Sequence, residues 1–566
     1  MKLRIFTFQV HLKKAFLTSC SLLICLAAMA QLDNTVEVTN EAKPVVTDVK
    51  KMPVKTKPAE TQVTHYTMQY AVNGQPLNNY VAEPLGDYES EAVWKGNKKG
   101  YVHLSGGVPN NLDGMAAYQL DLTKNDALRV DFSLKGFNGK TKENKYFGLK
   151  DWESRDYRNR IGLRYNHRFD NGVDLFVKGD YENQLFNYMT ANASGTDKQH
   201  NVLGSVVVGL TPYQFENFTF DATAGVKFFS QNHRTNLQKK LGETLLQLDG
   251  TASYRISDEH GVGLGVGAFY SAYGNVELDG ITRLRFTPHY KYSSEQMDLK
   301  LGVFVSTKGN VAPDASLTYH ISPKSDFYAK ARGYEENNDF RHLTDIHPYF
   351  VLDGHISTTN DGIIKMQDAF HYIDAQVGYR FKSDYGLIGD LNVGFDQSKN
   401  HLDIMWRANT RYGAENPWAE FTKNKSFYLN ADFVYNYQDI VKVDARHRLN
   451  IESNKRPGED WLEGSYINPA FEMNWKADFK LMKNLYAGVD WRLACFSNPN
   501  IKVETGSAYE RPNTVNLGAS IRYTLPIEMP LTVFVKGDNL LNQNYDRYFG
   551  YRNIGTSFLG GFAFSF

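Results

Sequence analysis

The sequence predicts an all-β protein, a transmembrane antiparallel β-barrel of about 22 strands with short periplasmic turns and long extracellular loops. Three observations predict this fold class. Apolar and polar residues alternate with a period of two in stretches such as 128–135 and 515–525. Short and long connections between these stretches fall on opposite sides, as they do in outer-membrane barrels. After residue 30 no stretch holds 18 consecutive apolar residues, so an exported chain could cross a membrane only as a closed barrel.

Residues 1–30 are predicted to be a signal peptide. They combine a basic start, an apolar run at 15–27 that is too short to span a bilayer, and an Ala-Met-Ala end at 28–30. The mature chain would then begin at Gln31 and keep a single cysteine, Cys495, so no internal disulfide could form.

Residues 31–99 are interpreted as a Pro-rich periplasmic tail or linker without a full plug. Only 36–46 is extended enough to add as a strand to the sheet edge of a partner. The tail could therefore dock a periplasmic protein, or it could thread the lumen and narrow it. The five prolines that interrupt it are Pro44, Pro53, Pro58, Pro76 and Pro84.

Residues 100–566 are predicted to form the barrel. In 128–135, Leu128 and Val130 alternate with Arg129 and Asp131. A strand places such apolar residues on one face, whereas a helix would spread them around its axis. The charged second face is tolerated where it lines water. Predicted strands begin near 100, 115, 126, 158, 173, 199, 216, 243, 260, 279, 298, 311, 325, 368, 387, 426, 440, 466, 483, 514, 530 and 556.

The connections between these strands predict the orientation of the barrel. If the C-terminus is periplasmic, the short turns lie on the periplasmic side, and the even strand count brings both termini there. The long connections lie on the other side and are rich in Asn, Asp, Tyr and His, so they are expected to be extracellular loops. They are 139–157, 186–198, 231–242, 336–367, 398–425, 453–465, 497–513 and 542–555.

The last 36 residues carry two features of a closing strand. One parity of the final strand is aromatic, with Phe558, Phe562, Phe564 and Phe566 on the same face. This face is expected to meet lipid as the strand closes the barrel. The preceding segment holds Asn539, Leu540, Asn542, Tyr545, Gly550 and Tyr551.

Taken together, this segment and the terminal Phe resemble the C-terminal end of the barrel of TonB-dependent outer-membrane receptors. The resemblance implies an outer-membrane location, contact with outer-membrane lipid, and recognition by the barrel-assembly machinery through the C-terminal strand. Members of that family carry a globular plug before the barrel. The 31–99 segment is shorter than an ordinary domain, so the sequence predicts a form without a recognisable plug and leaves the involvement of TonB open.

Composition and motifs exclude several functions. Without the first 30 residues, 59 basic residues face 63 acidic ones, which argues against a nucleic-acid partner. The stretch 139–141 ends like a P-loop, but Leu134 stands where its first Gly is needed. His342 and His347 are five residues apart without an HExxH pattern, and no GxSxG elbow occurs. We therefore predict no enzyme activity, no cofactor and no catalytic, cofactor-binding or metal site.

Three functions of different classes remain from the sequence, and the least favoured of them is a membrane-embedded enzyme. The first is solute transport or pore function across the outer membrane. The alternative is a non-transporting barrel that anchors or assembles cell-surface proteins, with a periplasmic or surface protein as partner. The alternative arises because barrels of this size are normally plugged, and an open one would be a leak.

Overall fold

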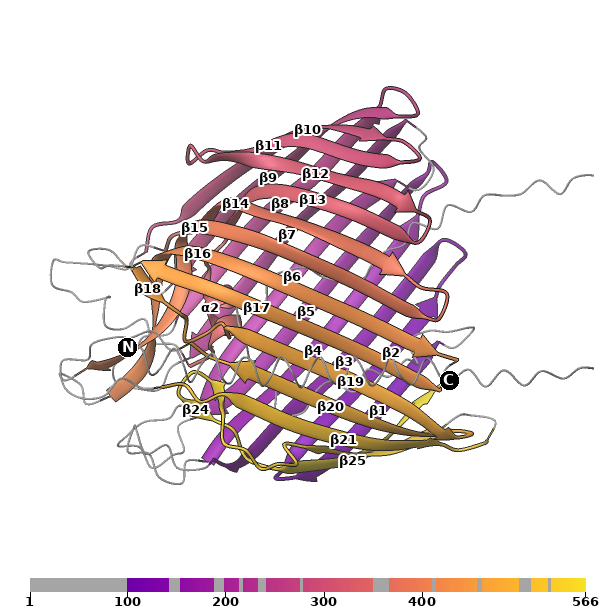
Figure 1. The fold of residues 1–566 in the computed structure, drawn as a ribbon, viewed down its shortest axis with the longest axis vertical. Coiled ribbons are helices and arrows are strands. Elements are labelled where there is room, and N and C mark those ends of the chain that lie inside the picture. The colour runs from indigo at the N-terminus through magenta and orange to yellow at the C-terminus, as the bar shows by residue number, and fades with distance from the viewer. Residues whose placement is uncertain are drawn as a thin grey trace, which may run out of the picture. The chain divides into compact units, whose positions relative to one another are not determined.

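The computed structural model describes residues 99–141, 153–187, 198–212, 217–232, 241–274, 278–349, 366–409, 414–438, 440–455, 461–497, 510–527 and 531–566. These residues form a barrel of tilted strands (Figure 1). The predicted signal peptide and the predicted tail up to residue 98 lie outside the described residues. Within the described part of the chain, no helix is long and apolar enough to cross a membrane.

The barrel wall consists of 22 antiparallel strands, which confirms the predicted fold class. They are β1 (Gly100–Val108), β2 (Asn111–Asp121), β3 (Asp126–Lys140), β4 (Glu153–Arg168), β5 (Val173–Asn187), β6 (Lys198–Pro212), β7 (Phe218–Asn232), β8 (Leu241–Arg255), β9 (His260–Gly274), β10 (Ile281–Ser293), β11 (Met297–Ser306), β12 (Val311–Ser322), β13 (Ser325–Glu336), β14 (Ala369–Lys382), β15 (Leu387–Asn409), β16 (Ala414–Tyr437), β17 (Val441–Lys455), β19 (Phe471–Met482), β20 (Leu485–Cys495), β21 (Thr514–Thr524), β22 (Leu531–Asp538) and β25 (Ser557–Ser565).

The first and last strands close the wall. Val102 of β1 faces Ala116 of β2 on one side and Phe564 of β25 on the other. The short β18 (Trp461–Glu463) pairs with the end of β17 beside β19, so it extends the sheet without adding a wall strand. A closed wall has no unpaired edge, which is what a sheet needs in order to satisfy its backbone in lipid.

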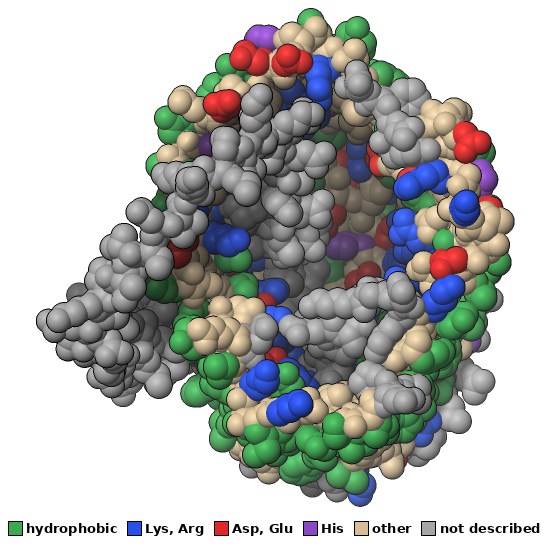
Figure 2. Space-filling view, turned by 90° about the vertical axis from the view of Figure 1, so that its right-hand side faces the viewer, with side chains coloured by type: hydrophobic (Ala, Val, Ile, Leu, Met, Phe, Trp, Pro, Cys, Tyr) green, Lys and Arg blue, Asp and Glu red, His purple; other side chains and the backbone are tan. Residues whose placement is uncertain are grey.

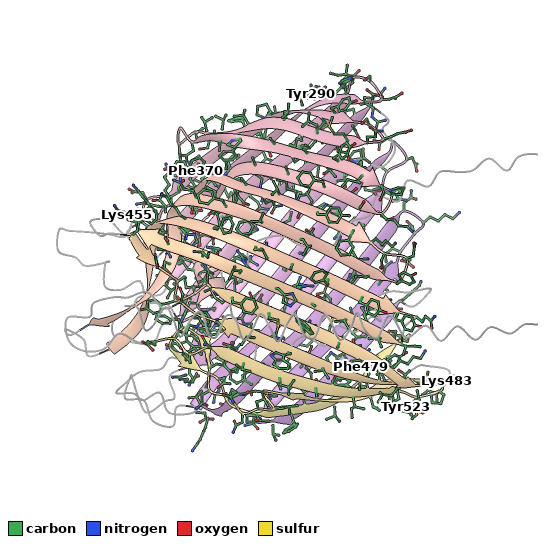
Figure 3. All side chains as sticks on the ribbon, in the orientation of Figure 1. Tyr290, Phe370, Lys455, Phe479, Lys483 and Tyr523 are labelled. Atoms are coloured by element: carbon green, nitrogen blue, oxygen red, sulfur yellow. The ribbon has the colours of Figure 1, made fainter. Side chains whose placement is uncertain are left out.

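The two faces of the wall differ as the sequence predicts. Ile161 and Leu163 of β4 are exposed on the outer face, and Arg160, which precedes them on the other parity, pairs with Asp180 of β5 on the inner face. Aromatic residues mark the outer face near the end of the strands, where Figure 3 shows Phe479 and Tyr523 close to Lys483. Aromatic girdles of this kind lie at membrane–water interfaces.

Two inner-face tyrosines lie flat across glycines of a neighbouring strand. The ring of Tyr328 covers Gly378, and the ring of Tyr428 covers Gly394. A side chain at either glycine would collide with the ring above it. Such aromatic-over-glycine pairs fix the register between neighbouring strands.

The connections sort largely by length. We call the end where β25 stops the turn end, and the opposite end the loop end. Connections at the turn end are two to six residues long. In the turns at Gly172 and Gly386 these residues have φ of 88° and 81°, a conformation that L side chains rarely adopt. Long connections occur at the loop end, although four connections of two to six residues lie there as well, at 109–110, 275–280, 307–310 and 410–413.

The prediction of a loop at 398–425 is wrong. It is a paired extension of β15 and β16, in which Leu402 faces Phe421. The register shifts between Ser398 and His401, and Asn400 has φ of 54°. Bulges of this kind bend a strand pair, and here the bent extension contributes Leu402 to the closure of the loop end. The content of Asn and Asp had suggested a loop, but backbone pairing decides the structure.

Strand length varies around the ring. The strands from β3 to β9 have 15 or 16 residues each. Beside the closing seam, β1, β22 and β25 have only nine, eight and nine residues. The wall is therefore lowest where the first and last strands meet.

Candidate functional site

The barrel encloses a lumen lined by charged side chains. Figure 2 looks into the turn end and shows a hollow with Lys and Arg gathered on its right-hand side. Many inner charges pair across or along the wall strands. Examples are Lys300 Nζ to Asp314 Oδ2 at 2.6 Å, Arg380 Nε to Asp390 Oδ2 at 2.8 Å, and Arg522 Nη1 to Asp478 Oδ1 at 2.7 Å. Exposed pairs of this kind contribute at most about 1 kcal/mol each, and charged side chains are tolerated here because the inner face lines water.

Four segments from three loop-end connections pack together at that end of the lumen, and we call them the cap. They are 337–349, 366–368, 464–468 and 545–553. The first contains α2 (Phe340–Ile346), whose N-cap Asp339 accepts a hydrogen bond of 2.7 Å from His342 N. The last contains the short strands β23 (Asp546–Tyr548) and β24 (Tyr551–Arg552). Figure 1 shows α2 at the loop end of the barrel.

An apolar core joins the cap to the wall. Phe340 and Leu343 of α2 are completely buried. Each such side chain contributes roughly 1.5–3 kcal/mol when removed from water, so the core fixes the cap firmly. The wall strands β6, β7, β8 and β15 and the other cap segments complete it. Its further members are Ile346, Leu203, Phe229, Leu241, Met366, Leu402, Ile404, Tyr466, Ile467 and Phe549.

Polar contacts hold the first cap segment in one position. Glu243 of β8 accepts a hydrogen bond of 2.7 Å from Phe340 N at the start of α2. Asn338 Nδ2 donates to Gln367 O at 2.8 Å and to Asn400 O at 3.0 Å. These contacts satisfy buried backbone groups that would otherwise oppose closure.

The first and last cap segments pack on each other. His347 Nε2 donates to Phe549 O at 3.0 Å, and the ring of Tyr349 stacks on Tyr551 with centroids 3.8 Å apart. Burial lowers the pKa of His347 to about 3, because the charged imidazolium would lose its water. His347 is therefore neutral and uses its Nε2 proton for the bond to Phe549.

A buried ion pair anchors the last cap segment to the wall. Arg547 Nη2 lies 3.0 Å from Asp156 Oδ2 of β4. Gln184 donates to the second oxygen of Asp156 at 3.0 Å, and Arg158 lies 3.7 Å away. The Asp156 side chain is 2% exposed. A pair this deep depends on both partners, because either charge alone would be costly to bury.

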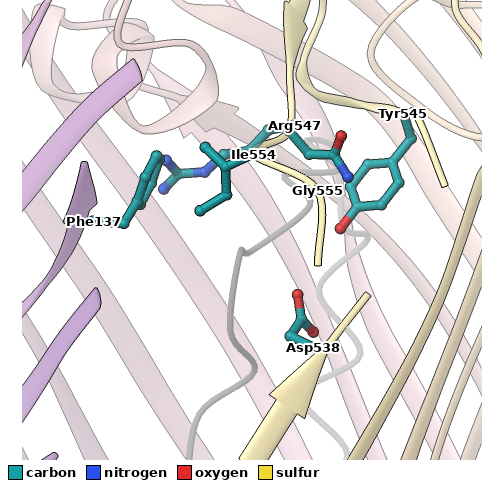
Figure 4. A pocket seen from close by; sticks show the side chains of 7 residues that line it. Phe137, Asp538, Tyr545, Arg547, Ile554 and Gly555 are labelled. Atoms are coloured by element: carbon teal, nitrogen blue, oxygen red, sulfur yellow. The ribbon is translucent and has the colours of Figure 1, made fainter. Parts of the chain in front are cut away.

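A small cavity beside this pair is shown in Figure 4. It has a volume of about 10 Å³ and is lined by Phe137, Asp538, Tyr545, Arg547, Asn553, Ile554 and Gly555. This volume suits about one water molecule. Within the described part of the chain, Arg547 Nε and Asn553 Oδ1, which belong to two of the lining residues, have no hydrogen-bond partner. The cavity is too small for a solute.

A second charged cluster ties the cap to β10 and the β11–β12 turn. Asp368 lies 2.6 Å from Arg283 Nε and 2.5 Å from Lys308 Nζ. Glu335 accepts hydrogen bonds of 2.6 Å from both Ser306 and Asn310. The cap is therefore fixed to the wall by ion pairs on two sides.

The structure places the predicted C-terminal residues in two different environments. Phe558, Phe562 and Phe566 are exposed on the outer face, and Phe564, which is partly buried, shares their parity on β25. Asn539 and Asn542, with φ of 48° and 50°, turn the chain after β22, and Leu540 lies between them. Tyr545, Gly550 and Tyr551 belong to the cap. The receptor-like segment is thus part of the closure of the lumen, whereas the terminal phenylalanines face outward.

His342 and His347, the two loop histidines considered as metal ligands, make different contacts. His342 Nε2 lies 3.6 Å from Glu336, whereas His347 bonds to a backbone carbonyl. Among the described residues, no group of three or more His, Cys, Asp or Glu side chains is placed to hold a metal ion.

Sequence reasoning missed the cap. One signal was present: Leu203, Phe229 and Leu241 are apolar residues at inner-face positions near the loop end. Apolar side chains on a face that otherwise lines water indicate that something covers them.

Comparison with known proteins gives matches in structure only. The sequence matches no protein-family model and no curated protein. The siderophore receptor PirA from Acinetobacter baumannii is similar, with a TM-score of 0.62, 10% identity, and coverage of 83% of this chain and 81% of that one. A mutant of the ferric enterobactin receptor PfeA from Pseudomonas aeruginosa is similar with a TM-score of 0.61 and 12% identity, and the match covers 83% of this chain and 81% of that one. The FrpB iron transporter from Neisseria meningitidis is similar with a TM-score of 0.63 and 10% identity, and the match covers 83% of this chain and 82% of that one. The described chain therefore has the 22-strand transmembrane barrel fold of TonB-dependent outer-membrane receptors.

Proposed function

We propose that this protein is an outer-membrane barrel that passes a hydrophilic solute when its cap leaves the lumen. One observation carries the proposal: a lumen lined by charged side chains is closed at the loop end by the chain's own loop segments. If the cap leaves, such a lumen offers a path lined by polar groups through the wall. The similar structures support transport as the class of function, since they include a siderophore receptor, an iron transporter and a copper transporter.

The orientation follows from the same proposal. The loop end with its cap would face outside, and the turn end with both termini would face the periplasm. The partners would be outer-membrane lipid and, through the C-terminal strand, the barrel-assembly machinery. The chemistry of the described residues does not select a particular solute.

Conductance in a planar bilayer tests the proposal. We expect the full-length protein to conduct poorly, and a Leu343→Ala variant to conduct in larger steps. Leu343 is completely buried in the cap core, and such truncations cost about 2–5 kcal/mol. Leu301→Ala is the matched control, because Leu301 is exposed on the outer wall and does not contact the cap.

The alternative function, a non-transporting barrel that anchors or assembles surface proteins, is favoured by how firmly the cap is held. Buried ion pairs and an apolar core keep it in place. If cap variants fold but conduct no better than the wild type, transport is refuted. Co-purification of a surface protein that depends on the loop end would then support anchoring.

A further inference from the structure

Three basic side chains stand side by side on the inner wall. Arg129 of β3 pairs in register with Arg164 of β4, and Arg164 pairs with Lys178 of β5. We call these three residues the basic row. The Arg129 and Lys178 side chains are 37% and 43% exposed, and Arg164 is exposed as well. The row is therefore open to the water of the lumen.

The wall compensates this charge only in part. Like charges directly opposite each other on neighbouring strands are destabilising. Lys178 lies 3.0 Å from Asp180, and Arg129 lies 4.0 Å from Asp131. Arg164, in the middle, bonds to the neutral amide of Asn166 at 3.0 Å and lies over the Phe176 ring. Among the described residues, no carboxylate lies within ion-pair distance of Arg164, so the row suits an anionic group from outside the wall.

The chain enters the wall beside this row. Lys99 O accepts a hydrogen bond of 2.8 Å from Gln119 N, and Gln119 pairs in register with Arg129. Neighbouring strands lie about 4.8 Å apart, so Lys99 is about 10 Å from Arg129 and about 19 Å from Lys178 along the ring. Lys99, the first residue that the structure describes, therefore lies at the level of the basic row.

A stretch of opposite charge lies eight to sixteen positions before Lys99, beyond the basic Lys95 and Lys98. Residues 72–94 contain no Lys or Arg, and they hold four acidic residues within nine positions. An extended chain covers up to about 3.3–3.6 Å per residue, so eight to ten residues before Lys99 can reach all three cations. The acidic residues are Glu83, Asp87, Glu89 and Glu91.

We infer that segment 83–91 of this chain enters the lumen from the turn end and binds the basic row. The proximity of Lys99 and the complementary charges support this occupant over a free anion, which would have to compete with a tethered one. This inference does not depend on whether the barrel transports a solute.

Photo-crosslinking of the full-length protein tests the inference. A photoreactive amino acid at Tyr88 leaves every charge of the segment and of the row in place. We expect its cross-links, mapped by mass spectrometry, to fall on inward-facing residues of β3, β4 and β5. Cross-links that fall instead on β13 and β14, across the ring, would overturn the inference.

Charge variants supply the control. Arg129→Gln, Arg164→Gln and Lys178→Gln combined should lower the yield about tenfold, because several weak contacts are lost together. Neutralising Glu83, Asp87, Glu89 and Glu91 to their amides should do the same. Lys330→Gln, which removes a lumen-exposed cation of β13, should change nothing. The acidic residues lie outside the wall strands, so their variant tests the inference even if the row variant fails to assemble. Yields unchanged by the acidic variant would refute it.

Discussion

The ion pair between Arg547 and Asp156 offers the sharpest test of the cap. Replacing Asp156 with Asn removes the charge that faces Arg547 at 3.0 Å and Arg158 at 3.7 Å. Arg547 would then be a buried cation without a counter-charge. Breaking a buried pair from one side costs about 3–5 kcal/mol. Since about 1.4 kcal/mol is a factor of ten, the closed cap should lose at least about a hundredfold in population relative to the open one.

Single-channel recording of purified protein in a planar bilayer measures this shift. We expect long openings in Asp156→Asn under conditions where the wild type stays closed. Asp180→Asn is the matched control on the neighbouring strand. Its partner Arg160 is 42% exposed in the lumen, and an exposed pair contributes at most about 1 kcal/mol. If Asp156→Asn keeps its heat-modifiable barrel and its gating equals that of Asp180→Asn, the buried pair does not hold the cap.

Three further predictions follow from the described contacts. Acid should open the cap, because the pKa of His347 is lowered to about 3 in the closed cap. Neutral His347 therefore stabilises the closed cap fully above pH 6.5, and this contribution is lost as pH falls from 6.5 towards 3. The loss is about 2 kcal/mol at pH 5. Conductance of the wild type should rise between pH 6.5 and pH 5, and an identical rise in His347→Gln would exclude this residue. The double variant Phe562→Asp with Phe564→Asp should fail to assemble, since both positions lie on the outward parity of β25 and charges there would face lipid. Normal outer-membrane levels of this variant would contradict the prediction. Ala563→Ser, on the inner face, is the control. Deletion of 31–95 should leave the barrel assembled, because β1 begins at Gly100; loss of the heat-modifiable form on gels would show that the wall depends on the tail.

The wall could be predicted from the sequence because its signal is local. Period-two alternation in stretches such as 128–135 shows strand and face together, and β3 runs through it as expected. Counting such stretches gave the correct number of strands. The predicted strand boundaries differ from those of the structure where charge and apolar content do not change at a strand end. β16, for example, begins at Ala414 rather than near residue 426.

The cap could not be predicted because its contacts join segments that are far apart in the sequence. His347 bonds to Phe549, 202 positions later, and Glu243 bonds to Phe340, 97 positions later. α2 has only seven residues, too few for a helical pattern to stand out or for a helix to form without tertiary packing. From its content of Asn, Asp and His alone, this loop would be predicted to be exposed to solvent, although the structure shows that much of it is buried.

The uneven height of the wall has a consequence for the surrounding membrane. At about 3.3 Å per residue and a tilt near 40°, a strand of eight or nine residues spans roughly 20–23 Å, whereas one of 15 residues spans roughly 38 Å. The hydrocarbon core of a bilayer is about 30 Å thick. Beside β1, β22 and β25 the lipid must therefore compress to match the protein. The barrel would sit in an asymmetric dimple that is thinnest along its closing seam, and this mismatch would draw other short-walled proteins to that side.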